Sequence, residues 1–88
     1  MNKSIKSKHF ANWLNRKIGG KDKFSTRFDW EKREINRWTQ GKNFPKVPIL
    51  AALLFDIHLY TGEEIELILI QCLEVLMKDY KEYKYGSQ

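Results

Sequence analysis

The stretch that decides the fold of this 88-residue chain is FSTRFDWEKREINRWTQG, residues 24–41. Its apolar residues recur at intervals of three and four, which places side chains on one face of an α-helix. Phe24 and Phe28 predict a short helix that begins near Asp22. Asp29 ends that helix, because aspartate is one of the few non-glycine residues that adopt a positive φ.

The second half of this stretch predicts another helix, from about Glu31 to Gln40, which ends at Gly41. At about 100° per residue, Ile35 and Trp38 fall on one side of it. Polar residues occupy the opposite side: Lys32, Arg33, Asn36 and Arg37. Arginine and lysine bind the acceptors of guanine, and asparagine binds adenine, although a basic helix face is often only solvated.

The flanking segments predict three more helices. The first runs from about Ser4 to Ile18, and the fourth has Pro48 in its first turn, where the missing N–H is harmless. The fourth helix is expected to be mostly buried, with this apolar face: Ile49, Leu50, Leu53, Leu54 and Ile57. Thr61 and Glu64 have the spacing of a capping box and predict a fifth helix of about twenty residues. Five helices predict an all-α domain.

The length and the charge restrict the class of protein. A chain of 88 residues forms one small domain and is too short for a doubly wound sheet, a barrel or a two-domain enzyme. Residues 1–50 contain 13 basic and 4 acidic side chains, a net charge of +9, whereas residues 51–88 have a net charge of −4. A basic half favours a polyanionic partner such as nucleic acid, although basic surfaces also occur without this role.

With these features in place, residues 22–57 resemble the helix-turn-helix of the Cro/repressor (XRE-like) family. Eight residues match its pattern of apolar, small and turn positions: Phe24, Ser25, Phe28, Trp30, Ile35, Trp38, Gly41 and Pro45. Residues 36–38 and 44–54 are also similar to the lambda-type phage activators of lysogeny, a branch with an extra C-terminal oligomerisation helix. The resemblance implies a five-helix lambda-repressor-like DNA-binding domain.

The resemblance also implies which residues contact DNA. The base-reading positions of the family fall on Lys32, Arg33, Asn36 and Arg37, and its backbone-contact positions fall on Lys21, Lys42, Asn43 and Lys46. Asp29 replaces the usual turn glycine, and Glu31 stands where serine or threonine usually caps the recognition helix. Alternatively, Asp29 itself caps that helix, which would then start two residues earlier.

The predicted fifth helix has more apolar surface than one contact requires. Its apolar residues spread over an arc of roughly 220°, against the roughly 100° typical of a surface helix. We expect oligomerisation through these residues: Ile65, Ile68, Leu69, Leu73, Leu76 and Tyr80. A partner protein is one alternative, and a helix that is simply central in a small core is another.

Together these features predict a sequence-specific transcription regulator, a repressor or an activator of phage or mobile-element type. It is expected to bind double-stranded DNA as a homodimer or higher homo-oligomer. Residues 1–60 are expected to form the DNA-binding domain, residues 61–83 the helix for core packing and oligomerisation, and residues 84–88 a frayed tail. The alternative function is a protein-interaction module that binds a host or antitoxin-system protein.

Other classes of function find no support in the sequence. We see no catalytic set of residues and no phosphate-binding glycine loop, and we expect no enzyme activity, cofactor or small-molecule substrate. Cys72, His9 and His58 lack the spacing of metal ligands. The apolar stretch 47–55 is far shorter than the roughly 20 residues of a membrane span, so a cytoplasmic protein is expected. The tryptophans are expected in the core rather than as stacking platforms for single-stranded nucleic acid.

Overall fold

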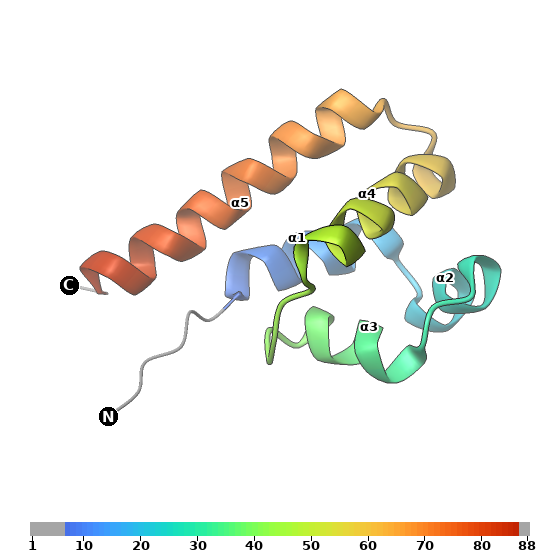
Figure 1. Ribbon diagram of the computed structural model, residues 1–88, viewed down its shortest axis with the longest axis horizontal. Coiled ribbons are helices and arrows are strands. Elements are labelled where there is room, and N and C mark those ends of the chain that lie inside the picture. Colours follow the sequence, from blue (N-terminus) through green and yellow to red (C-terminus); the bar gives the residue numbers. More distant parts are fainter. Residues whose placement is uncertain (1–6, 87–88) are drawn as a thin grey trace.

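The computed structural model describes residues 7–86, and these form five α-helices and no strand, which confirms the all-α class. The helices are α1 (Lys8–Ile18), α2 (Lys21–Phe28), α3 (Lys32–Thr39), α4 (Val47–Thr61) and α5 (Ile65–Tyr85). Helix α1 packs against each of the other four. Helix α5 lies along one side of the body and α3 lies on the opposite side (Figure 1).

The helix ends agree with the sequence in most places. Asp29 has φ 60° and ψ 43° and ends α2, as predicted. It therefore does not cap α3, which begins at Lys32 after Glu31, so the alternative of an earlier start is wrong. Ser7 precedes α1, and residues 4–6 of the predicted first helix lie outside the described residues.

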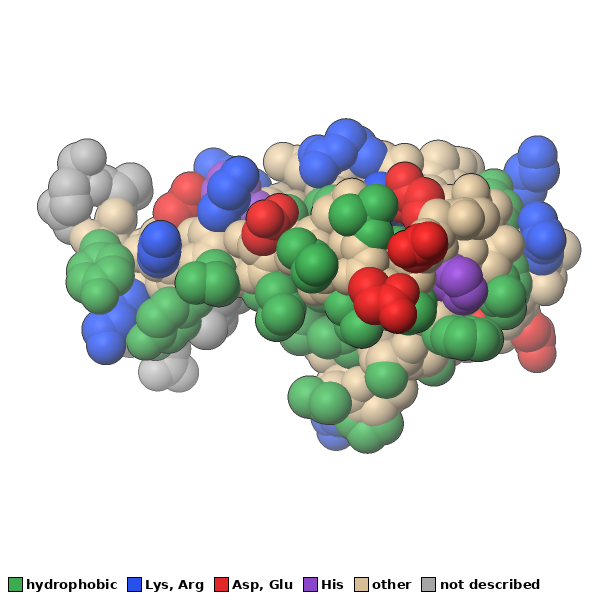
Figure 2. Space-filling view, turned by 90° about the horizontal axis from the view of Figure 1, so that it is seen from above, with side chains coloured by type: hydrophobic (Ala, Val, Ile, Leu, Met, Phe, Trp, Pro, Cys, Tyr) green, Lys and Arg blue, Asp and Glu red, His purple; other side chains and the backbone are tan. Residues whose placement is uncertain are grey.

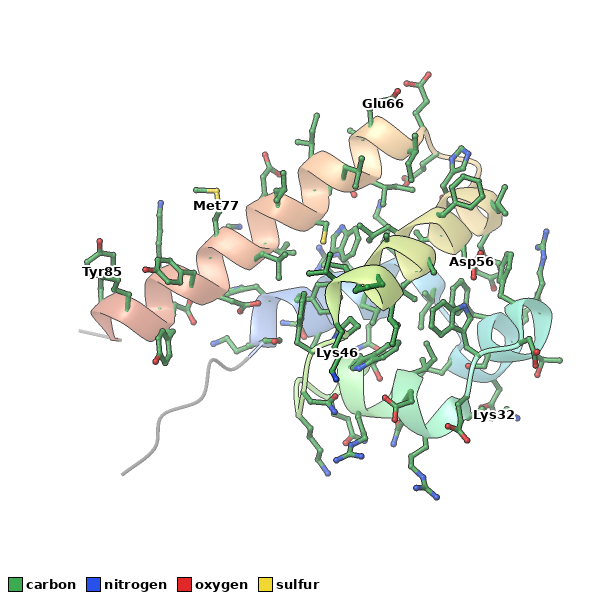
Figure 3. The ribbon with its side chains drawn as sticks, in the orientation of Figure 1. Lys32, Lys46, Asp56, Glu66, Met77 and Tyr85 are labelled. Carbon is green, nitrogen blue, oxygen red and sulfur yellow. The ribbon has the colours of Figure 1, made fainter. Side chains whose placement is uncertain are left out.

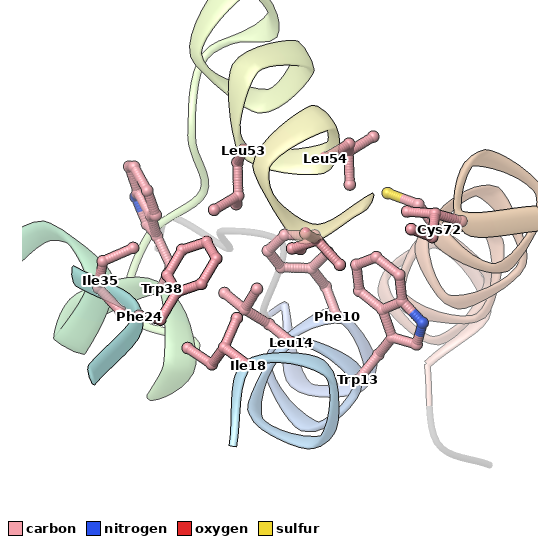
Figure 4. Packing of buried hydrophobic residues seen from close by; sticks show 12 residues of the cluster. Phe10, Trp13, Leu14, Ile18, Phe24, Ile35, Trp38, Leu53, Leu54 and Cys72 are labelled. Carbon is pink, nitrogen blue, oxygen red and sulfur yellow. The ribbon is translucent and has the colours of Figure 1, made fainter. Parts of the chain in front are cut away.

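The core is formed by apolar side chains from all five helices (Figure 4). Phe10 of α1 is fully buried, and the centre of its ring lies 5.9 Å from that of Trp13 and 4.8 Å from that of Phe44. Trp13 and Trp38 are both buried, so neither can stack on a nucleic-acid base. Trp30 is partly buried against the core. The placement of the tryptophans in the core is thus confirmed.

The prediction that α4 is mostly buried is wrong. Leu53, Leu54 and Ile57 lie in the core, but Phe55 is 53% exposed and Leu59 is exposed as well. Helix α4 packs on α1 and α5, and the ring of its Tyr60 also packs against Phe24 of α2, with 5.3 Å between the ring centres. Ile49, which the sequence places on the buried face of this helix, is 42% exposed, so that assignment is also wrong.

The predicted capping box at the start of α5 is also wrong. Thr61 is the last residue of α4, and its hydroxyl donates to the carbonyl of Ile57 at 2.8 Å. The same oxygen accepts the N–H of Glu63 at 3.1 Å, not that of residue 64. Gly62 ends α4 with φ 79°, and Glu64 precedes α5 without a side-chain capping bond. Thr61 therefore belongs to the end of α4 and Glu64 to the start of α5, and the two do not form a capping box.

The first turn of α1 is capped by a side chain of α5. Asp79 is only 2% exposed, and its carboxylate accepts the N–H of His9 at 2.8 Å and that of Phe10 at 3.0 Å. The first N–H groups of a helix have no partner within the helix and carry partial positive charge. A carboxylate 70 residues away in sequence therefore caps α1 and fastens it to α5.

A second contact strengthens this junction at the surface. The ring Nε2 of His9 lies 2.6 Å from Oε2 of Glu82, and this hydrogen bond lowers the pKa of the Glu82 carboxyl. Helix α5 continues through Lys84 and Tyr85, two residues past the predicted end at residue 83, and residues 87–88 of the expected tail lie outside the described part. None of the described helices combines the length and apolar character needed to cross a membrane.

The junction of α1 and α5 can be tested by removing the capping carboxylate. We expect Asp79→Ala to lower the free energy of unfolding by about 1–3 kcal/mol, because two N–H groups lose a charged acceptor. Urea denaturation followed by circular dichroism measures this loss. Glu82→Gln is the matched control and should shift the midpoint much less, since Glu82 is exposed. Equal shifts for the two variants would contradict the capping role of Asp79.

Candidate nucleic-acid interface

Helices α2 and α3 are joined by a tight turn at the end of the molecule away from α5 (Figure 1). The left-handed Asp29 redirects the chain, and the N–H of Trp30 donates to the carbonyl of Ser25 at 2.9 Å. The indole N–H of Trp30 also donates to Asp56 of α4 at 2.8 Å. The ring of Trp30 packs edge-on against that of Trp38, with 5.8 Å between the ring centres. The start of α3 is therefore fixed to both α2 and α4.

Helix α3 has one buried and one exposed side. Ile35 and Trp38 enter the core, and the buried hydroxyl of Thr39 donates to the carbonyl of Ile35 at 3.0 Å. The four predicted base-reading residues are all exposed: Lys32, Arg33, Asn36 and Arg37. The structure therefore anchors α3 by its apolar residues and presents its basic and amide side chains to the outside.

A hollow of about 270 Å³ connects the exposed side of α3 with the start of α2. It is lined by Lys21, Asp22, Lys32, Arg33 and Asn36. The ammonium of Lys21 donates to the amide oxygen of Asn36 at 2.8 Å, and that of Lys32 lies 3.9 Å from Asp22. The Asn36 oxygen has a second lone pair and its NH₂ group has two protons, so this amide retains both donor and acceptor capacity.

The other predicted backbone-contact residues lie in the segment between α3 and α4, where Lys42, Asn43 and Lys46 are all exposed. The segment is tied to α3, because the N–H of Lys42 donates to the carbonyl of Arg37 at 3.0 Å. Gly41 has φ 73°, a conformation that side chains disfavour, and this allows the chain to leave α3 sharply. The structure thus brings the predicted base-reading and backbone-contact residues onto neighbouring surfaces.

Basic and acidic groups are separated across the molecule. Lys32 and Lys46 lie on the side of the body opposite Glu66, at the start of α5 (Figure 3). The face that carries α5 shows both acidic and basic side chains among hydrophobic ones (Figure 2), and residues 51–88 have a net charge of −4. Glu63, next to this helix, is paired with Lys17 of α1 at 2.6 Å. A polyanion would therefore meet less repulsion on the side of α3 than on the side of α5.

The structure divides the predicted oligomerisation residues. Leu69, Leu73 and Tyr80 are exposed, whereas Ile65 and Leu76 are half-buried. Ile68 is 0% exposed, so its assignment to an oligomer surface is wrong. It belongs to the stripe of α5 that packs on the core, and the sequence pattern does not separate this stripe from the exposed one beside it.

Cys72 shares the core-facing stripe of α5 and is buried, as expected. Burial raises the pKa of its thiol to about 11, so the thiol stays protonated at neutral pH. Ile70 and Met77 are also exposed, next to the predicted oligomerisation residues, and were not among those predicted from the sequence. Another stripe of α5 already packs on the core, so apolar residues outside that stripe indicate a second apolar surface. This is the sequence signal that could have identified Ile70 and Met77.

Within residues 7–86, no group of three or more histidine, cysteine, aspartate or glutamate side chains is placed to hold a metal ion. No family model, curated protein or solved structure matches the chain. The geometry of α2 and α3 and the sequence pattern within them are therefore the features that point to a function.

The two sides of α3 should differ sharply in their effect on stability. Arg33→Ala and Arg37→Ala are expected to change the free energy of unfolding by no more than about 0.5 kcal/mol, because both side chains are exposed. Trp38→Ala should cost about 3–5 kcal/mol, since it removes a buried aromatic ring. Urea titrations of the three variants provide the comparison. A large loss for either arginine variant would indicate that the arginine stabilises the fold instead of being available to a ligand.

Proposed function

We propose that this protein binds double-stranded DNA in a sequence-specific manner, with α3 in the major groove. The observation that carries the proposal is the division of α3 into a buried side with Ile35 and Trp38 and an exposed basic and amide side. A major groove admits an α-helix, and its base edges offer acceptors and donors that match arginine, lysine and asparagine. Helix α2, joined by the Asp29 turn, would cross the DNA backbone.

Phosphate contacts would come from residues around this helix. Lys21 lies at the start of α2, and Lys42, Asn43 and Lys46 follow α3 in the chain. Lysines at these places would neutralise phosphates and release condensed counterions, which contributes affinity without sequence preference. They would also set the position of α3 along the groove.

The resemblance to the Cro/repressor family supports the same proposal and makes it more specific. We propose a lambda-repressor-like domain that acts in the cytoplasm as a transcription regulator of phage or mobile-element type, either a repressor or an activator. A single helix-turn-helix reads few base pairs, so two or more copies are usually joined for tight binding. A homodimer or higher homo-oligomer formed through α5 is therefore part of the proposal.

A second candidate is a protein-interaction module, favoured by the exposed apolar residues on α4 and α5. In that case a host or antitoxin-system protein would cover these helices, and contact with DNA would be weak and nonspecific. Competition separates the two functions. Specific complexes with a selected DNA site should survive an excess of bulk DNA, whereas nonspecific retention should disappear with bulk DNA or moderate salt.

The residues of α3 should differ from those of the following loop in their effect on DNA binding. We expect Arg33→Ala or Arg37→Ala to weaken specific binding by about 1–3 kcal/mol and to relax the base preference. Lys46→Ala should weaken specific and random sites alike and reduce the salt slope by about one unit. Fluorescence anisotropy on a site selected from random DNA, at several salt concentrations, measures both effects.

Lys78→Ala is the matched control, because this lysine lies on α5 and is exposed. It should leave the affinity for the selected site nearly unchanged. If the arginine and lysine variants all lose affinity equally for specific and random DNA, α3 does not read bases. If no site is enriched from random DNA at all, the interaction-module function gains the stronger support.

A further inference from the structure

Helix α5 has an exposed apolar face beside the stripe that packs on the core. Its residues are Leu69, Ile70, Leu73, Met77 and Tyr80. Leu73 is 60% exposed and Met77 is 58% exposed. Hydrophobic side chains are numerous on the face of the molecule that is seen from above (Figure 2). Contiguous apolar surface of this kind on a small domain marks an interaction site.

The charges at the two ends of this face have opposite signs. Glu66 lies in the first turn of α5 and Lys84 in its last turn, and both are exposed. Eighteen residues correspond to five full turns, so the two side chains have the same angular position, about 27 Å apart along the helix. The ammonium of Lys84 lies 5.9 Å from the ring centre of Tyr80, which places it on the apolar face.

The charged and apolar residues of this face are arranged symmetrically about residue 75 of α5. Glu66 and Lys84 are equally far from residue 75, and so are Ile70 and Tyr80. Leu73 and Met77 have the same symmetry. These residues place opposite charges at the two ends of the face and apolar side chains at its middle, so that part of the face is complementary to its own reversed copy, as a two-fold contact between identical chains requires.

We propose that a second copy of this chain packs on α5 in antiparallel orientation, with the two-fold axis at the level of residue 75. Glu66 then faces Lys84 of the second copy, and Leu73 lies opposite its Met77 near the centre of the contact. A parallel pair would place Glu66 opposite Glu66 and Lys84 opposite Lys84, so like charges disfavour it relative to the antiparallel pair. This inference rests on the homo-oligomer of the proposed function and gives that contact its orientation and register.

A hollow beside this face fits the same arrangement. It has a volume of about 270 Å³ and is lined by Ser7, Phe44, Leu76, Asp79 and Tyr80. Tyr80 belongs both to this hollow and to the apolar face, so a second copy that covers Tyr80 would also border the hollow.

The antiparallel orientation also has a consequence for DNA. In such a pair the two-fold axis runs across the helices, perpendicular to the direction of the contact. At 100° per residue, the core-facing residues Ile68, Cys72 and Asp79 lie roughly 140° around α5 from Leu73 and Met77, so the axis is inclined toward the core. Helix α3 lies on the side of the body opposite α5 (Figure 1). Both copies of α3 would therefore face the same side of the dimer. One DNA duplex could then contact both, as paired half-sites require.

Cysteine cross-linking of the protein without DNA tests the orientation. Glu66→Cys and Lys84→Cys proteins are mixed in equal amounts and oxidised with diamide. We expect mainly the mixed disulfide dimer, because only an antiparallel pair brings these two positions together. The buried Cys72 can remain in place, since its protonated thiol reacts poorly. Self-linked Glu66→Cys dimers as the main product, or no dimer at high protein concentration, would overturn the proposal.

Charge reversal with rescue provides the second measurement, by sedimentation velocity over a range of concentrations. Glu66→Lys and Lys84→Glu should each weaken dimerisation about tenfold, and the double variant should restore it, because the two pairs are reformed with exchanged charges. Glu74→Lys is the matched control on another side of α5, where it lines a hollow with Trp13 and Arg16, and should have little effect. Circular dichroism verifies that all variants fold.

The outcomes for self-association and for DNA binding are independent. A dimer with the expected cross-link that enriches no DNA site would leave this inference standing and defeat the proposed function. A wild-type chain that remains monomeric up to several hundred micromolar, or a double variant that stays as weak as the single ones, would defeat this inference. A protein recovered only with an unrelated partner covering the face, and never with itself, would also defeat it.

Discussion

The burial of one side of α1 is the constraint on which the rest of the structure depends. Phe10, Leu14 and Ile18 of this helix are completely buried, and α1 contacts all four other helices. A small domain has few completely buried side chains, so each of them fixes the positions of several helices. Helices α2 and α3 are held on one side of α1 and α5 on another, and this separates the basic surface from the apolar one.

The same constraint explains the exposed side of α3. A helix of eight residues has too few hydrogen bonds to be stable alone, and its stability must come from tertiary packing. Ile35 and Trp38 provide that packing, together with the contact between Trp30 and Trp38. Because Ile35 and Trp38 occupy the side of α3 that faces the core, Arg33 and Arg37 must lie on the side that faces solvent. The packing of the helix sets their direction. Surface side chains that the fold does not need remain available for a ligand.

Local patterns could be predicted from the sequence, and contacts between distant residues could not. The intervals between Phe24 and Phe28 and between Ile35 and Trp38 indicate helix faces directly, and Asp29 indicates the turn between them. The capping role of Asp79 depends on the approach of α1 to α5, which no interval in the sequence reveals. One indirect signal exists, since Asp79 falls at helical spacing from the apolar residue Cys72 and a carboxylate there requires partners.

The prediction for α5 failed at Ile68 for a related reason. Hydrophobicity alone marks a broad arc, whereas the structure separates it into a stripe with Ile68 and Cys72 against the core and a second stripe with Leu73 and Met77 in solvent. The charges distinguish these stripes better than the apolar residues do. Asp79 is buried with the first stripe and bonds to α1, but Glu66 and Lys84 flank the second and are exposed. One helix can therefore hold its own domain together and still present a separate apolar surface, because the two stripes occupy different angular positions.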